Sequence, residues 1–184
     1  MEIYSVGKPI GLFYKEGRKI KMANKKYCVI RTDAMTATDV ASALRSLRVY
    51  NDANEPIEVE NGVVVELLGY EEGEREVMKA KLATAESKKE DCVIVATPEV
   101  MYDERKRDLG DFINEAGTIC RGYVPHARDM YSITKEGFVG ETVPAVGDEL
   151  AVGENGKMTA GEGWGKVMAI ETVGRYTYYV IKIA

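Results

Sequence analysis

Few residues of the chain have side chains that could support catalysis. His126 is the single histidine, which excludes metal sites built from several imidazoles and leaves one imidazole base. Cys120 is the cysteine nearest to it in sequence, and a thiol beside a histidine is the arrangement that activates a cysteine nucleophile. Ser42, Ser87 and Ser132 lie in no Gly-x-Ser-x-Gly motif. We therefore predict that the chain is not an enzyme. A Cys120–His126 enzyme is an alternative, and it would show one thiol far more reactive than the other two.

Metal and cofactor sites are not indicated either. Cys28, Cys92 and Cys120 are odd in number and form no Cys-x-x-Cys pair, so we expect reduced, half-buried thiols rather than disulfides or a zinc site. The acidic clusters at residues 71–74, 90–91 and 103–104 lack EF-hand spacing and are typical of solvated turns. We expect no metal and no cofactor.

The glycine-rich segment 161–165 contains the only tryptophan, Trp164. It lacks the Gly-Lys-Ser/Thr ending of a phosphate-binding loop, and no helical pattern follows it. The segment is therefore predicted to be a hairpin tip. Trp164 is a candidate interface anchor because tryptophan is enriched at binding hot spots. The alternative is that it covers the end of a barrel.

Alternating apolar residues between glycine-containing turns predict a mainly β fold, a small β-barrel or sandwich with one or two short helices and an extended N-terminal arm. Asn155-Gly156 predicts a type I′ hairpin, because both central residues of that turn need positive φ. Apolar spacing over residues 36–47, with Thr36 as a possible N-cap, predicts a helix of about three turns. The expected strands are residues 27–31, 62–69, 75–80, 92–96, 119–124, 130–133, 149–152, 166–171 and 176–183.

Charge divides the chain unevenly. Residues 1–26 carry seven basic and two acidic side chains, +5, whereas the remainder carries 18 basic and 28 acidic side chains, −10. An acidic body disfavours direct nucleic-acid binding, which depends on basic groups that displace counterions. The sequence contains no apolar run long enough to span a bilayer and no signal peptide, so we expect a soluble protein without a membrane partner.

These patterns divide the chain into a basic N-terminal arm (residues 1–26), a helix and loop connection (27–59) and a β-rich barrel domain (60–184). The arm is predicted to pair with a neighbouring subunit. Alternatives are a solvated tail, or an upstream segment translated from an early start, with Met22 as the true beginning.

The order of motifs in the C-terminal half is more specific than any one of them. Val-Gly-Asp at 146–148, Asn-Gly-Lys at 155–157, a strand 165–171 with Gly, Val, Ala and Glu, and a closing strand 178–183 resemble the small β-barrel of tailed-phage capsid decoration and head structural proteins. Segments 96–104, 114–117, 121–123 and 129–134 are also similar to head-associated proteins of phages that infect Gram-positive bacteria. The resemblance covers roughly residues 60–184.

This resemblance implies a virion structural protein: a capsid decoration, or cement, protein that binds the exterior of the phage head and stabilises contacts between major capsid subunits. It would be assembled in the host bacterial cytoplasm. The expected partners are the major capsid protein and further copies of the chain, in a trimer or similar ring. The basic Lys8, Lys15, Arg18 and Lys19 would complement an acidic neighbour.

The alternative is a β-barrel binding module that recognises a peptide or carbohydrate. Its site would lie around Tyr176, Tyr178 and Tyr179 on the last predicted strand. The same tyrosines could instead pack against a strand face.

Overall fold

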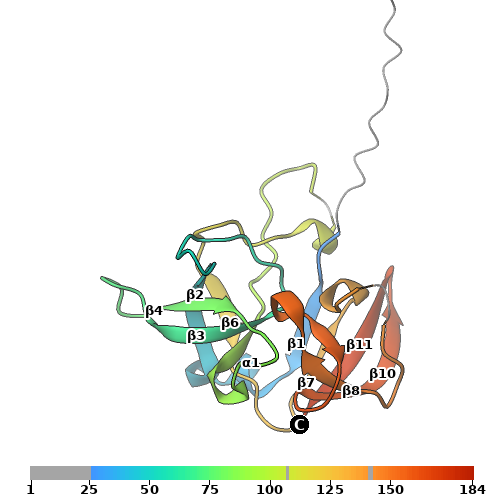
Figure 1. Cartoon of the computed structure of the whole chain (residues 1–184). Helices are drawn as coiled ribbons and strands as arrows, with labels where there is room; N and C mark the ends of the chain where they lie inside the picture. The colour runs from blue at the N-terminus through green and yellow to red at the C-terminus, as the bar shows by residue number, and fades with distance from the viewer. Residues whose placement is uncertain (1–25, 107, 141–142) are drawn as a thin grey trace, which may run out of the picture.

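The structure, a computed structural model, describes residues 26–106, 108–140 and 143–184. Within these residues the chain forms a closed five-stranded barrel and a six-stranded sheet (Figure 1). The predicted mainly β fold with a small barrel is confirmed. Of the predicted N-terminal arm, only Lys26 belongs to the described residues. No helix in the described ranges is long and apolar enough to cross a membrane.

The barrel has the strand order β2-β4-β3-β5-β6, and β2 pairs with β6 to close it. Strands β2 and β4 are parallel, and the other barrel pairs are antiparallel. Leu47, Val49, Ala80 and Val93 belong to the hydrophobic cluster of this barrel. The strands are β2 (Leu44–Tyr50), β3 (Val64–Tyr70), β4 (Val77–Leu82), β5 (Cys92–Val95) and β6 (Cys120–Tyr123).

The second sheet has the order β1-β7-β11-β10-β8-β9 and is antiparallel throughout. Its strands are β1 (Ile30–Ala34), β7 (Met130–Ile133), β8 (Glu149–Val152), β9 (Met158–Ala160), β10 (Gly165–Val173) and β11 (Tyr176–Ile183). The helices are all short: α1 (Thr36–Asp39) and the 3-10 turns η1 (Ala41–Ala43), η2 (Lys89–Asp91), η3 (Leu109–Asp111), η4 (Lys135–Gly137) and η5 (Glu154–Gly156).

The barrel and the sheet share a core through strand β5, all four residues of which are buried. Successive side chains of a strand point to opposite faces. Val93 and Val95 accordingly pack in the barrel cluster, whereas Ile94 packs in a second cluster with Ile133 and Ile181 of the sheet. The two sheets therefore form one continuous body.

The predicted strands 130–133, 149–152 and 176–183 coincide with β7, β8 and β11. The other predicted strands overlap observed ones, with ends displaced by a few residues.

The predicted three-turn helix over residues 36–47 is wrong. Only the short α1 and the 3-10 turn η1 are helical in this range, and Leu44 already belongs to β2, which pairs with β4 and β6 along its length. Leu47 and Val49 are buried at the two-residue spacing of a strand. Thr36 is not the N-cap, which is Met35. The backbone N–H and the hydroxyl of Thr36 both donate to Asp129 Oδ1, at 3.1 and 2.6 Å. Tertiary hydrogen bonds thus override a weak local helical pattern.

Residues 27–59, predicted to be a helix and loop connection, contribute β1 to the open sheet and β2 to the barrel. The barrel is formed between residues 44 and 123, whereas the motif-bearing segment 146–183 builds most of the open sheet. Residues 60–184 are therefore not a separate barrel, because both sheets need a strand from the preceding segment.

The predicted Asn155-Gly156 turn joins β8 to β9. Both residues have positive φ, 56° at Asn155 and 69° at Gly156. A Cβ on Gly156 would lie 2.1 Å from the carbonyl oxygen of Val64. The turn therefore packs against the barrel strand β3, and only glycine fits there.

Candidate functional site

The Cys120 and His126 side chains of the enzyme alternative make separate contacts. Cys120 is buried in the barrel cluster, and burial raises the pKa of its thiol to about 11. The His126 ring lies instead near Asp129, with Nδ1 3.7 Å from Oδ2. Burial likewise raises the thiol pKa of Cys28 to about 12 and that of Cys92 to about 11. All three thiols are protonated at neutral pH, which is the opposite of an activated nucleophile.

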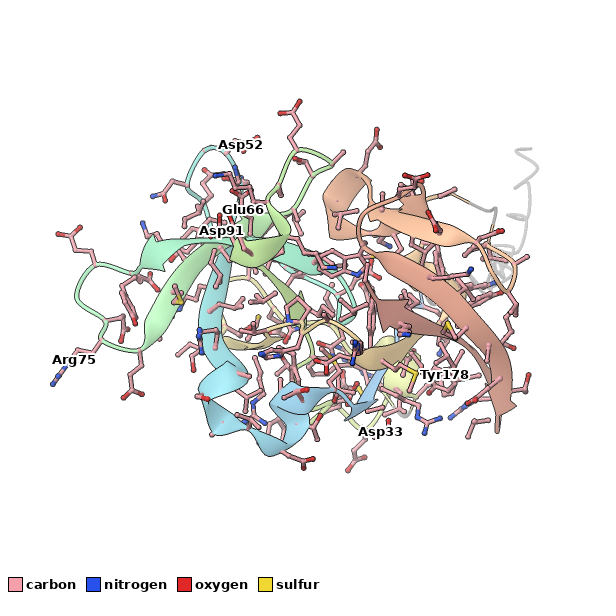
Figure 2. The ribbon with its side chains drawn as sticks, turned by 90° about the horizontal axis from the view of Figure 1, so that it is seen from below. Asp33, Asp52, Glu66, Arg75, Asp91 and Tyr178 are labelled. Atoms are coloured by element: carbon pink, nitrogen blue, oxygen red, sulfur yellow. The ribbon has the colours of Figure 1, made fainter. Side chains whose placement is uncertain are left out.

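Glu71 and Glu74 of the first acidic cluster contact Arg48. No group of three or more His, Cys, Asp or Glu side chains suited to a metal occurs in the part of the chain that the structure describes. Glu71, at the start of the β3–β4 hairpin loop, instead accepts hydrogen bonds from the Tyr50 hydroxyl and from Arg48 Nη1, the latter at 2.6 Å. The tip of this hairpin, marked by Arg75, projects from the body (Figure 2).

Trp164 is buried rather than displayed, with 2% of its surface exposed. Its Nε1 donates to the hydroxyl of the buried Tyr131 at 2.8 Å, and the Lys89 ammonium lies over its ring at 5.7 Å. The side chain offers almost no surface to a partner. The interface role predicted for Trp164 therefore does not fit its placement, which is that of a core residue.

The tyrosines of β11 contact other parts of the protein. Tyr178 and Tyr179 are buried, and Tyr179 packs edge-on against Phe138 with ring centroids 5.1 Å apart. Tyr178 lies beside β1, the strand that carries Asp33 (Figure 2), with the Arg31 guanidinium 5.6 Å from its ring centroid. Tyr176 uses its hydroxyl to accept a hydrogen bond from the Gly110 N–H at 3.2 Å. These tyrosines serve packing, as the alternative interpretation held.

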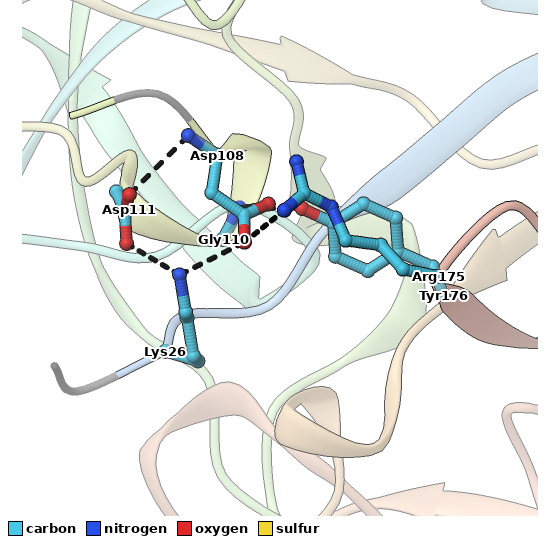
Figure 3. Close-up of polar contacts among 6 residues, drawn as sticks. All are labelled: Lys26, Asp108, Gly110, Asp111, Arg175 and Tyr176. Atoms are coloured by element: carbon cyan, nitrogen blue, oxygen red, sulfur yellow. Dashed lines mark hydrogen bonds and ion pairs between the residues drawn. The ribbon is translucent and has the colours of Figure 1, made fainter. Parts of the chain in front are cut away.

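A charged cluster fixes the point where the basic arm joins the body (Figure 3). Lys26 Nζ donates to Asp111 Oδ1 at 2.7 Å and to Asp108 Oδ2 at 2.9 Å. Arg175, in the β10–β11 turn, reaches the same Asp108 oxygen at 3.3 Å. The bond to Asp111, followed by that to Asp108, raises the pKa of the Lys26 ammonium. We call Lys26, Asp108, Asp111 and Arg175 the arm root.

The backbone around η3 is built to present these carboxylates. Asp108 caps the turn by accepting from the Gly110 N–H, and the Asp111 side chain accepts from the Asp108 N–H. The residue that follows the arm is bound to the same turn, because Tyr27 N–H donates to the Gly110 carbonyl at 2.8 Å. The acidic pair 103–104, expected from sequence to lie in a solvated turn, is therefore followed closely by a structural contact at Asp108.

A groove of about 660 Å³ opens beside the arm root. The groove lies between the two halves of the long connection from β5 to β6. Its apolar lining includes Val100, Met101, Tyr102, Phe112, Ile113 and Ile119. Three of these are strongly exposed, Val100 at 59%, Tyr102 at 93% and Ile119 at 49%. Exposed apolar surface of this kind marks an interaction site. We call it the 97–119 groove.

Two buried asparagines, Asn61 and Asn114, connect the two sides of the groove through hydrogen bonds. Asn61 exchanges hydrogen bonds with Thr97, its Nδ2 donating to the Thr97 carbonyl at 2.8 Å and its Oδ1 accepting from the Thr97 N–H at 3.0 Å. Asn114 Nδ2 donates to Asn61 Oδ1 and to the Val59 carbonyl. Both sides of the groove are thus attached to one buried polar network, which preforms it.

Sequence reasoning identified the arm but missed its root and the groove. Lys8, Lys15, Arg18 and Lys19, the predicted interface residues, lie outside the described residues. A usable signal was present in the Asp108-x-x-Asp111 capping pattern, which marks a fixed turn instead of a solvated run. The apolar triplet at 100–102 in a charged connection was a second signal.

Comparison with known proteins adds no family to this description. The chain matches no protein-family model, no curated protein and no solved structure.

Proposed function

We propose that the chain is a virion structural protein, a capsid decoration protein that binds the outside of a phage head and stabilises contacts between major capsid subunits. The proposal begins from the ordered motifs of residues 146–183, which resemble such proteins. In the structure these motifs follow one another through β8, β9, β10 and β11.

The arm root is the observation that carries the proposal. An arm with five more positive than negative charges leaves a body of opposite net charge at a fixed point. Fixing the root limits the directions that the arm can take, so less freedom is lost when the arm binds. Such an arm suits a protein that must reach a neighbouring subunit.

Because a capsid lattice repeats the same contact many times, a weak contact per copy is sufficient for stable binding. On a capsid lattice each copy is held near several others, so individual weak contacts combine into strong overall binding. The acidic body and the basic arm give one chain both partners of an electrostatic contact, which suits a ring of identical copies. A homo-oligomer, a trimer or similar ring on the capsid exterior, is the arrangement that we propose.

A peptide-binding module is the second candidate, favoured by the 97–119 groove. Its volume and apolar lining are in the range of sites for small ligands and peptide side chains. The proposed site differs from the tyrosine strand that the sequence indicated.

The proposal is tested by density-gradient sedimentation of virions, with this chain quantified in each fraction against the major capsid protein. Co-migration at a constant, near-stoichiometric ratio is the expected result. A chain that stays at the top of the gradient would refute the proposal and leave the binding module.

Variants of the arm root sharpen the test. Asp108→Asn combined with Asp111→Asn removes both carboxylates that hold Lys26, and we expect reduced occupancy on the particle. Asp33→Asn is the matched control, because Asp33 is exposed and, within the part of the chain that the structure describes, forms its ion pair with Arg31 on its own strand. Equal occupancy of both variants would show that the arm root does not contribute.

A further inference from the structure

The 97–119 groove leaves apolar side chains in water beside a charged anchor point. Val100, Tyr102 and Ile119 are 59%, 93% and 49% exposed. Because Asp111 of the arm root directly precedes Phe112 of the groove lining, the two features adjoin. The N-terminal arm therefore begins next to an exposed apolar groove.

We propose that the groove receives residues 10–14 of the arm of a neighbouring copy. This inference rests on the homo-oligomer of the proposed function and names the surface through which the copies would join. The segment reads Ile-Gly-Leu-Phe-Tyr and is the most apolar stretch of the arm. Its leucine, phenylalanine and tyrosine can bury the area that the groove lining exposes.

Charge supports the same pairing. Lys8 and Lys15 flank the apolar segment, and residues 1–25 carry six basic and two acidic side chains, +4. The connection 97–119 carries six acidic and three basic side chains, −3. Asp103 and Glu115 stand among the residues that line the groove, whereas Lys106 opposes them and Arg105 pairs with Asp103 at 2.8 Å. The net field favours a basic peptide over an acidic one.

The length of the arm permits a contact with a neighbouring copy. Residues 15–25 separate the apolar segment from Lys26 and carry five basic and one acidic side chain, +4. The twelve steps from residue 14 to Lys26 span at most about 40 Å. A folded body of this size is on the order of 40 Å across. The linker is therefore long enough for residues 10–14 to reach a copy that packs against the first.

The groove needs no rearrangement to accept the segment. The Asn61–Asn114 network fixes both of its sides, with Asn61 1% and Asn114 4% exposed. A preformed groove loses little freedom on binding, which raises affinity for an incoming peptide.

Disulfide trapping between full-length chains tests the inference. One chain carries Leu12→Cys and a second, of different mass, carries Ile119→Cys. The three native thiols are buried with raised pKa values, so they contribute little background. The matched control pairs Leu12→Cys with Leu68→Cys, because Leu68 on β3 is 54% exposed, close to the 49% of Ile119. Mixed dimers are counted by mass after mild oxidation.

We expect at least a tenfold excess of the mixed dimer with Ile119→Cys over the control. A chain that carries both Leu12→Cys and Ile119→Cys should form linked oligomers. A disulfide within one chain instead would overturn the inference and assign the groove to the chain's own arm. Equal yields at the two positions, at every protein concentration tested, would overturn it as well.

The outcome is separable from that of the gradient experiment. Chains that co-migrate with heads but give no excess of mixed dimer refute the groove contact and leave the decoration role. Chains that form the mixed dimer but stay at the top of the gradient support the contact and refute the decoration role.

Discussion

Replacing Trp164 and Tyr131 singly and together measures what the only tryptophan does. The indole Nε1 donates to the Tyr131 hydroxyl at 2.8 Å, and the two side chains are 2% and 1% exposed. Burial raises the pKa of the Tyr131 hydroxyl, which therefore stays protonated. A hydrogen bond between two buried neutral groups stabilises the fold mainly because either group alone would be costly to bury.

The expected magnitudes follow from that asymmetry. Tyr131→Phe leaves the indole N–H without its acceptor, which costs about 1–3 kcal/mol of unfolding free energy. Trp164→Phe leaves the hydroxyl without its donor and opens a cavity, at a cost of about 3–5 kcal/mol. The double variant no longer has an unpaired polar group from this pair, so it should lose less than the sum of the two by about 1–2 kcal/mol.

Urea unfolding followed by circular dichroism gives all four free energies without depending on tryptophan fluorescence. Tyr102→Phe is the control, because Tyr102 is 93% exposed and its replacement should leave the midpoint unchanged. Single effects that add to within about 0.5 kcal/mol would refute the reasoning. Unchanged stability of Trp164→Phe, accompanied by weaker assembly, would restore the interface role predicted from sequence.

Three further perturbations test other contacts of the fold. Gly156→Ala should cost several kcal/mol by urea unfolding, because its Cβ would meet the Val64 carbonyl at 2.1 Å; Gly73→Ala, at φ 82° with open space, should cost only about 1–2 kcal/mol. Asn114→Ala removes a donor from the buried network beneath the groove and should cost about 1–3 kcal/mol, with groove binding weakened in a peptide titration. Burial raises the pKa of Cys28 from 9.0 to about 12, so its contribution to stability is complete below pH 9 and falls as the pH rises toward 12; a Cys28→Ala chain should show a shallower decline over that interval.

The fold was predictable where local pattern and tertiary environment agree. In strand β11, Tyr179, Ile181 and Ile183 are buried at a two-residue spacing, and the strand follows a glycine turn. Its predicted and observed limits coincide. The Asn155-Gly156 turn needs two positive φ values, which few other residue pairs supply, and both are observed. In such segments the local conformational preference agrees with the fold, so the sequence pattern predicts the structure.

The fold was not predictable where distant residues decide. Leu44 and Leu47 fit a helical face as well as a strand, and the choice is made by β4 and β6, which pair with β2. The glycines around Trp164 favour an exposed turn. Tyr131, 33 residues earlier, supplies the hydrogen-bond acceptor that makes burial of the indole favourable. No local window contains either partner.

The candidate site depends on still longer separations, and this explains why the sequence showed the arm without its anchor. Lys26 meets Asp108 and Asp111 across 82 and 85 positions, and Arg175 reaches Asp108 from the far end of the chain. Read locally, each is one charge in a charged segment. Placed together, two cations share one carboxylate, and the second carboxylate, Asp111, also holds Lys26. Because Lys26 is held by a contact that also holds the β10–β11 turn, a force on Lys26 would be passed to the six-stranded sheet, which is what the proposed tie between neighbouring subunits needs.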